Sequence, residues 1–142
     1  MRGDVDDLYA RGAAALFFPH GVGHLLGVDV HDMEDLGDRA GYAPGRARAA
    51  ARGDRYLRLD RDLQPGMCVT IEPGFYQIRP ILESKSEVGD LESALNRHEL
   101  ARFADVRGIR IEDDVLVTEG GSEVLSRSVP KSVADVESAM QG

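Results

Sequence analysis

Apolar positions recur along this chain with two different periods, and the periods separate helical from extended segments. Residues Val5 to Leu16 place apolar side chains at helical intervals, which predicts a helix with Asp4 as its N-cap. Gly108 to Thr118 instead alternates every second residue, with a break near Asp113, and predicts a strand. Met67 to Ile71 is apolar and partly β-branched and predicts a second strand.

Turn residues mark where the strands begin and end. The Gln64-Pro65-Gly66 string has the signature of a type II turn, because proline presets the first central dihedral and glycine accepts the positive one. Glu72-Pro73-Gly74 stops the strand that follows and leaves Glu72 at its end, after which Phe75 to Ile81 is expected to resume as extended chain. Glu119-Gly120-Gly121-Ser122 predicts a turn into a short strand at Glu123 to Leu125.

The remaining segments are less regular. Phe17 to His31 is a glycine-rich loop that is expected to end in a short strand-like stretch at Val28 to His31. Met33 to Arg61 is rich in Arg, Gly and Asp and indicates a solvated surface loop or a lid. Leu82 to Phe103 has helical spacing with mixed charge and predicts no definite elements, whereas Val129 to Met140 predicts a polar stretch and a short amphipathic helix.

Length and composition indicate one domain in a reducing compartment. A chain of 142 residues, 42% of them hydrophobic, can bury one core without disulfide bonds. The single cysteine, Cys68, lies in the predicted strand beside Met67 and Val69 and is expected to be a small buried residue. No apolar stretch approaches the roughly 20 residues that span a bilayer, and the N-terminus lacks the pattern of a signal peptide. We therefore expect a cytoplasmic protein without a membrane partner.

The net charge argues against nucleic acid as a partner. The chain has 25 acidic and 17 basic residues and a formal charge of −8. Phosphate backbones are bound by positive surfaces that release counterions, which an acidic chain does not offer. The acidic balance serves solubility and is also compatible with a site that concentrates divalent cations.

Five side chains indicate a metal site. His20, His24 and His31 lie in the glycine-rich segment, and Glu72 and Glu112 lie on the predicted strands. Histidine and glutamate are common ligands of first-row transition metals, and a carboxylate buried in a strand needs a positive partner. Each residue alone has an ordinary explanation: a glutamate on an exposed edge strand, or a histidine with a hydrogen bond. The conjunction of His24, Glu72 and Glu112 favours metal binding.

Three motifs in order carry a resemblance to a known family. They run from His20 to Asp32 (HGVGHLLGVDVHD), from Leu63 to Tyr76 (with IEPGFY at its end), and from Gly108 to Asp114 (GIRIEDD). This pattern resembles the Xaa-Pro dipeptidase (prolidase) and aminopeptidase P branch of the pita-bread metallopeptidases. The resemblance implies an α+β fold, in which a curved, mostly antiparallel sheet carries the ligands and helices cover its convex face.

The resemblance also implies roles for individual residues. His24, Glu72 and Glu112 match ligands of a dinuclear centre of manganese, cobalt or zinc, with manganese foremost; Glu72 would also handle a proton of the nucleophilic water, and Glu112 would bridge the two ions. His20 and His31 match histidines that contact the substrate and stabilise the tetrahedral intermediate. Arg110 matches an arginine of the catalytic site. The implied activity is hydrolysis of an N-terminal Xaa-Pro bond in dipeptides or peptides by a metal-bound hydroxide.

The chain departs from the family pattern in one respect. The family uses two further aspartate ligands upstream of the histidine loop, and Asp4, Asp6 and Asp7 occur only in the predicted helix. We therefore expect residues 1–142 to be a single, truncated C-terminal part of a catalytic domain, with Met1 as an artificial or alternative start, that is inactive by itself and binds one metal ion at most. Its uncovered apolar faces predict a homodimer. The alternative is a non-catalytic pita-bread module that binds peptides or proteins.

Overall fold

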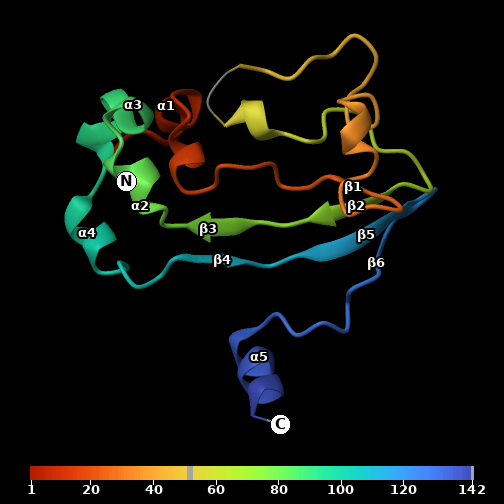
Figure 1. Ribbon diagram of the computed structural model, residues 1–142. Helices are drawn as coiled ribbons and strands as arrows, with labels where there is room; N and C mark the ends of the chain where they lie inside the picture. Colours follow the sequence, from red (N-terminus) through yellow and green to blue (C-terminus); the bar gives the residue numbers. More distant parts are fainter. Residues whose placement is uncertain (51–52, 142) are drawn as a thin grey trace.

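The computed structural model describes residues 1–50 and 53–141, and its strands form two antiparallel sheets (Figure 1). The larger sheet has the order β1-β2-β5-β6, and the smaller one pairs β3 with β4. Every strand pair is antiparallel among the described residues, which confirms the predicted α+β class with a mostly antiparallel sheet. The strands are β1 (Leu25–Leu26), β2 (Cys68–Ile71), β3 (Gly74–Tyr76), β4 (Gly108–Arg110), β5 (Asp113–Thr118) and β6 (Gly121–Val124).

The two sheets share one long two-stranded ribbon. β2 continues into β3 through Glu72 and Pro73, and β4 continues into β5 through Ile111 and Glu112. The register of β2 with β5 and that of β3 with β4 is the same, so that Glu72 stands directly opposite Glu112 at the interruption. The amide of Ile111 donates to the carbonyl oxygen of Pro73 at 3.1 Å and keeps the two strands together there. The ribbon thus brings two carboxylates from distant parts of the sequence to one place.

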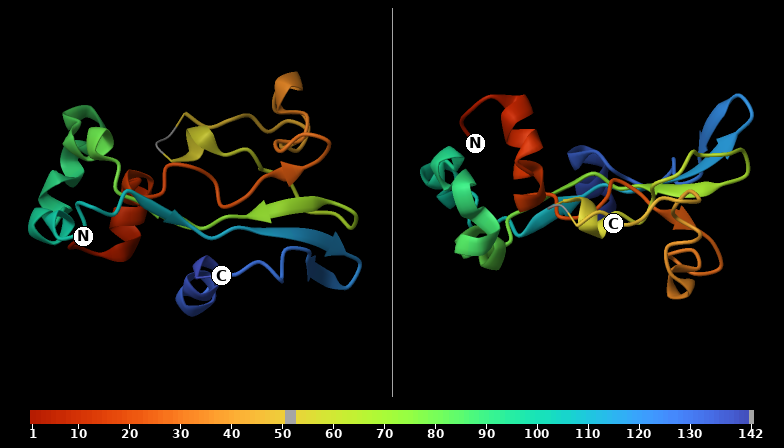
Figure 2. Two further views of the ribbon diagram at one scale, coloured as in Figure 1. Left: turned by 60° about the horizontal axis from the view of Figure 1, so that its bottom comes forward. Right: turned by 90° about the horizontal axis from the view of Figure 1, so that it is seen from above.

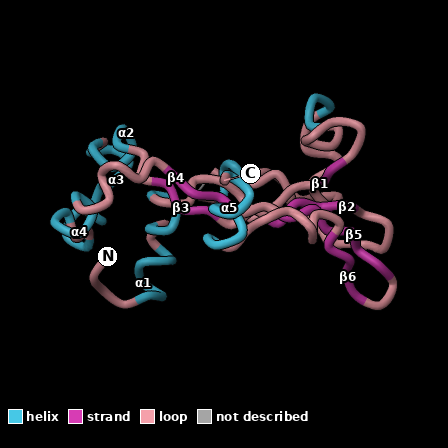
Figure 3. The backbone as a smooth tube through the Cα atoms, turned by 90° about the horizontal axis from the view of Figure 1, so that it is seen from below, coloured by secondary structure: helices cyan, strands magenta, loops and turns pink. Residues whose placement is uncertain are grey.

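The helices α1 to α4 gather at the β3–β4 end of this ribbon, whereas α5 lies apart beneath β4 and β5 (Figures 1 and 3). The hydrophobic core lies among the helical segments and comprises Ala13, Leu16, Leu82, Val88, Leu91 and Leu95. Figure 2 shows the same separation from two further directions. The helices are α1 (Val5–Ala10), η1 (Ala13–Leu16), η2 (Glu34–Leu36), η3 (Asp54–Tyr56), α2 (Arg79–Glu83), α3 (Lys85–Val88), η4 (Gly89–Ala94), α4 (Arg97–Ala101) and α5 (Val133–Met140), where η denotes a 3-10 helix.

Several predicted boundaries are confirmed. The Asp4 carboxylate accepts a hydrogen bond from the amide of Asp7 and caps α1. Gly66 has a φ of 91°, and the amide of Met67 donates to Gln64, as a type II turn requires. The break in the strand of residues 108–118 falls at positions 111 and 112, immediately before Asp113.

Three predicted elements are wrong in part. The helix over residues 5–16 is interrupted at Gly12, whose φ of 73° ends α1 before η1 begins. No strand forms at residues 28–31, because the chain loops back on itself there: the amide of Asp32 donates to the carbonyl of Leu25. The extended segment expected at residues 75–81 ends after Tyr76, and Pro80 lies in the first turn of α2, where its missing amide costs nothing.

The structure also resolves the segment for which the sequence predicts no definite elements. Residues 82–103 contain the end of α2 together with α3, η4 and α4, which bury Leu82, Val88 and Leu91 against the first helices. The long loop at residues 33–61 contains only the short helices η2 and η3 among its described residues. No helix in the described part of the chain has the length and hydrophobicity needed to cross a membrane.

Candidate metal centre

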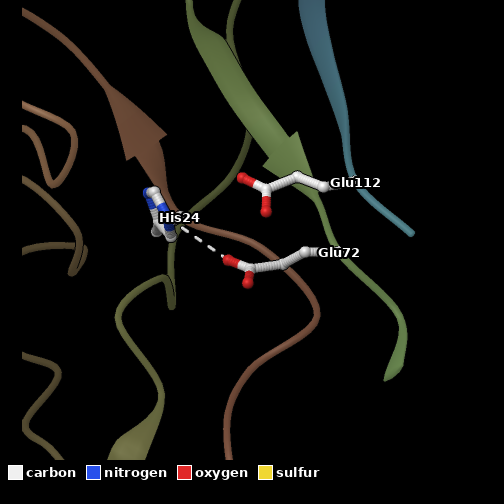
Figure 4. Close-up of side chains that lie close together, drawn as sticks. All are labelled: His24, Glu72 and Glu112. Atoms are coloured by element: carbon white, nitrogen blue, oxygen red, sulfur yellow. Dashed lines mark ion pairs between the residues drawn. The ribbon is translucent and has the colours of Figure 1, made fainter. Parts of the chain in front are cut away.

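Three of the predicted ligands converge at the interruption of the ribbon. One ligand atom each from His24, Glu72 and Glu112 lies within 4.8 Å of the others (Figure 4). His24 and Glu72 are each only 6% exposed, whereas the side chain of Glu112 is 35% exposed. The set is therefore a cluster of one imidazole and two carboxylates in which His24 and Glu72 are buried and Glu112 is the more exposed member.

Backbone pairing places His24 beside β2. The amide of Thr70 donates to the carbonyl of His24 at 2.9 Å, and the amide of Glu72 donates to the carbonyl of Val22 at 2.7 Å. These bonds extend the pairing of β1 with β2 backwards through the glycine loop. Gly23 makes this approach possible, because a Cβ atom at that position would lie 2.0 Å from the carbonyl oxygen of Thr70. The glycine of the HGVGH string thus has a steric reason.

Thr70 connects the histidine strand to the first carboxylate. Its hydroxyl oxygen accepts a hydrogen bond from the amide of His24 at 3.0 Å, and the hydroxyl donates to Oε1 of Glu72 at 3.1 Å. Thr70 is 1% exposed, so neither bond competes with bulk water. An orienting partner of this kind fixes a ligand in place before any ion arrives.

The protonation of His24 leaves a ligand atom directed into the site. Its Nδ1 lies 3.0 Å from the carbonyl oxygen of Leu25, which can only accept, so Nδ1 carries the hydrogen. In the neutral ring Nε2 then carries no hydrogen, and its lone pair is directed at Oε1 of Glu72, which lies 3.2 Å away. The lone pairs of Nε2 and Oε1 repel each other unless a proton or a metal ion lies between them. This geometry fits a divalent ion held by His24 and Glu72.

The negatively charged carboxylates of Glu72 and Glu112 repel each other, and Arg110 offsets part of this repulsion. Glu72 and Glu112 are cross-strand neighbours, a position in which like charges are unfavourable. Arg110 places Nη1 3.3 Å from Glu72 Oε2 and Nη2 3.1 Å from Glu112 Oε2. Burial disfavours the charged guanidinium, but the carboxylates of Glu112 and Glu72 outweigh burial and raise the pKa of Arg110.

The structure brings the remaining predicted histidines next to this centre. His20 Nδ1 lies 4.0 Å from Glu72 Oε2, and its Nε2 is 2.9 Å from the hydroxyl of Tyr76. The His31 ring packs edge-on against His24 with ring centres 4.6 Å apart, and its Nδ1 lies 3.0 Å from Oε2 of Glu34. Both histidines therefore flank the three ligands.

Two residues of the site were missed in the sequence. Thr70 shares a strand face with Glu72, two residues away, and Tyr76 shares that face four residues beyond Glu72. The only sequence signal for either residue is this period of two, which ordinary strand residues also show. The predicted roles of His20, His31, Arg110 and the three ligands remain predictions that their placement supports.

Comparison with known proteins agrees with this geometry. Residues 3–119 match the model of metallopeptidase family M24. The chain is 43% identical to human Xaa-Pro dipeptidase over 142 residues, which are 100% of this chain and 27% of that protein. It is 46% identical over 128 residues to the Xaa-Pro dipeptidase of Xanthomonas campestris strain B100, covering 84% of this chain and 26% of the relative.

Solved structures show the same relationship. Aminopeptidase P from Escherichia coli superimposes with a TM-score of 0.60 at 37% identity, covering 99% of this chain and 24% of that one. A zinc-substituted form of the E. coli enzyme in complex with product gives a TM-score of 0.59 at 36% identity, with the same coverage. The predicted resemblance and fold class are thereby confirmed, and the chain spans about a quarter of the length of these relatives. On the evidence of its motifs, its ribbon and these matches, the chain belongs to metallopeptidase family M24.

Proposed function

We propose that this chain supplies His24, Glu72 and Glu112 to the metal centre of a proline-specific metallopeptidase that cleaves an N-terminal Xaa-Pro bond. The observation that carries the proposal is the convergence of these three ligand atoms within 4.8 Å, at a point where two carboxylates oppose each other across a ribbon. The named Xaa-Pro dipeptidase relatives support the choice of substrate. A bound divalent ion would supply a Lewis acid that activates water and polarises the scissile carbonyl.

The residues of this chain would divide the remaining work. Oε1 of Glu72 is held by Thr70, which leaves Oε2 facing Arg110 and His20 and available to take a proton from water. His20 and His31 flank the ligands and would orient the substrate. Three ligand residues leave a first-row ion incompletely coordinated, so we propose that the complete catalytic domain contributes further ligands.

We propose manganese as the first candidate ion, with cobalt and zinc as alternatives. Two carboxylates and one imidazole form an oxygen-rich set of ligands that is compatible with Mn²⁺ and is also found around Zn²⁺. The proposal extends to a homodimer, supported by the exposed apolar side chains of the ribbon, and to a cytoplasmic location, supported by the free thiol of Cys68. Sedimentation of a monodisperse monomer at high concentration, or recovery outside the cytoplasm on fractionation, would contradict these two points.

Calorimetric titration with Mn²⁺ and Zn²⁺ tests the ligand set directly. We expect at most one ion per chain, with binding lost in both Glu72→Gln and Glu112→Gln, because each change keeps the shape of the side chain but removes the charge. Glu119→Gln is the matched control, since Glu119 is exposed in the turn between β5 and β6. Equal binding by the wild type and both site variants would refute the ligand assignment.

A chimera tests the reaction. These 142 residues would replace the matching 27% of human Xaa-Pro dipeptidase, and release of proline from an Xaa-Pro dipeptide would be measured with Mn²⁺ present. We expect activity from the chimera and its loss in the Glu112→Gln version. A folded chimera that binds Mn²⁺ but releases no proline would refute the proposed reaction.

A non-catalytic peptide-binding module is the second candidate, and Arg110 is the observation that favours it. The guanidinium already pairs with both carboxylates, so that the cluster is partly neutralised by the protein itself. If the chain is such a module, the titration should show no metal binding, and Arg110→Gln should lower the free energy of unfolding because the two carboxylates lose their positive partner. If the chain is part of a metallopeptidase, the same substitution should leave the three ligands intact and able to bind the ion.

A further inference from the structure

Tyr76 forms a side-chain hydrogen bond with His20 that involves none of the three proposed metal ligands. Its hydroxyl lies 2.9 Å from Nε2 of His20. Nδ1 of His20 lies 2.8 Å from the carbonyl oxygen of Gly21, which can only accept a hydrogen bond, so Nδ1 carries the ring hydrogen. In the neutral ring Nε2 must therefore accept, and the Tyr76 hydroxyl is the donor.

The ring of Tyr76 reaches His20 because two glycines leave it room. Tyr76 pairs with Gly108 across the ribbon, and Gly74 precedes it on the same face. A Cβ atom on Gly74 would lie 2.8 Å from Cε2 of Tyr76, and one on Gly108 would lie 2.7 Å from its Cδ1. Both positions require glycine if the tyrosine ring is to lie across them.

The ring contacts of His20 show that the imidazole is held from two sides. Tyr76 meets it edge-on with centroids 5.3 Å apart, and Phe18 packs against it at 4.5 Å. The Tyr76 hydroxyl and the Phe18 ring thus hold the imidazole next to Glu72, whose Oε2 lies 4.0 Å from His20 Nδ1.

We propose that Tyr76 is a positioning residue of the site, which fixes His20 in its Nδ1–H form and holds the ring beside Glu72 through a glycine cradle formed by Gly74 and Gly108. This inference deepens the proposed function and rests on it for any consequence in turnover. The hydrogen bond itself is independent of the metal. Measuring the protonation of the two His20 nitrogens in the metal-free chain therefore tests the role of Tyr76 separately from the proposed enzymatic function.

The experiment is imidazole ¹⁵N–¹H correlation NMR on the metal-free 142-residue chain and its variants. In the wild type, we expect a protonated Nδ1 and an accepting Nε2 at His20. Tyr76→Phe should change the Nε2 shift and introduce the other tautomer, since the donor is gone while the ring remains. Tyr42→Phe is the matched control: it removes a hydroxyl that donates to Leu57 at 2.9 Å, away from the site, and should leave His20 unchanged.

A second pair of variants protects the test against a folding defect. Gly108→Ala crowds the Tyr76 ring without removing its hydroxyl and should change the His20 shifts in the same direction as Tyr76→Phe. Gly120→Ala is its control, because a Cβ atom there would meet nothing within 4 Å. Wild-type His20 shifts in folded Tyr76→Phe or Gly108→Ala protein would overturn the proposal.

The chimera then gives a readout that a purely structural role would not move. We expect Tyr76→Phe to lower kcat about tenfold while KM stays within about twofold, the size of effect that orienting partners usually have. Proportional loss of folded protein with unchanged kcat per folded molecule would overturn the positioning role. An inactive wild-type chimera with altered His20 shifts in Tyr76→Phe would refute the proposed function and leave the contact established.

Discussion

Thr70→Val tests whether the metal centre is held in place by the buried hydroxyl between its two strands. Valine keeps the volume and the β-branch of threonine and replaces only the hydroxyl. Two hydrogen bonds disappear: the one accepted from the amide of His24 at 3.0 Å and the one donated to Glu72 at 3.1 Å. Because Thr70 is 1% exposed, water cannot replace them.

The expected cost follows from the kinds of bond that are lost. A hydrogen bond to a charged group contributes about 1.5 to 3 kcal/mol, and one between neutral groups about 0.5 to 1.5 kcal/mol. The free energy of unfolding should therefore fall by about 2 to 4 kcal/mol, a large part of the roughly 5 to 15 kcal/mol that a domain has. Urea unfolding should move its midpoint down by about 1 to 2 M, and the Kd for Mn²⁺ should rise about 10- to 100-fold.

The assay is urea unfolding followed by circular dichroism, together with calorimetric titration. Thr118→Val at the exposed end of β5 is the control and should be close to neutral. In the Glu72→Gln background the cost of Thr70→Val should shrink, since the charged partner is already gone. A Thr70→Val protein with the wild-type midpoint and the wild-type Kd would refute the reasoning.

Three further predictions concern the backbone, the C-terminal segment and pH. Gly23→Ala should cost about 1 to 3 kcal/mol and abolish metal binding, because the new methyl would lie 2.0 Å from a backbone oxygen; wild-type calorimetry would contradict this. Lys131→Met should speed amide exchange at residues 126–131, since Lys131 lies 3.0 Å from Asp113, and Lys131→Arg should not. The Arg48 hydrogen bond holds the pKa of Asp38 below its ordinary value, so this pair stabilises the protein above about pH 4 and not once the pH falls through the lowered pKa. The stability difference between wild type and Arg48→Gln should therefore vanish in acid, and a constant difference would contradict the pairing.

The sequence predicts the elements that carry the site better than their arrangement. Periodicity correctly places the strands around Glu72 and Glu112, because a half-buried strand must alternate its side chains. It does not reveal that the two glutamates are opposite each other, since register depends on a pairing between segments 40 residues apart. The strand expected at Val28 to His31 is wrong because alternation there has no neighbouring strand: Val28 is fully exposed.

The same limit explains which site residues were missed. His24 and the glutamates are residue types that attract attention in any strand or loop, whereas Thr70 and Tyr76 are common in strands. Their importance comes from partners that lie far away in sequence, as the separation of 46 positions between His24 and Thr70 illustrates. Candidate metal ligands can thus be found from the sequence, whereas the residues that orient them can be identified only once the fold is known.

The ribbon has two faces, one that carries the site residues and one that carries apolar residues, because side chains alternate along a strand. Thr70, Glu72 and Tyr76 share one face, and on the other face Ile71 and Phe75 are each 41% exposed. Their neighbours across the ribbon, Ile109 and Ile111, are 63% and 45% exposed, so that this second face is apolar around these four residues and only partly covered, with Phe75 stacked on Phe17. In the proposed homodimer, a second copy of the chain could cover this apolar face without touching the metal ligands, because consecutive residues of a strand point to opposite sides. A partner bound there would stiffen the strands that carry Glu72 and Glu112, and metal affinity should therefore rise with association even though no partner atom enters the site.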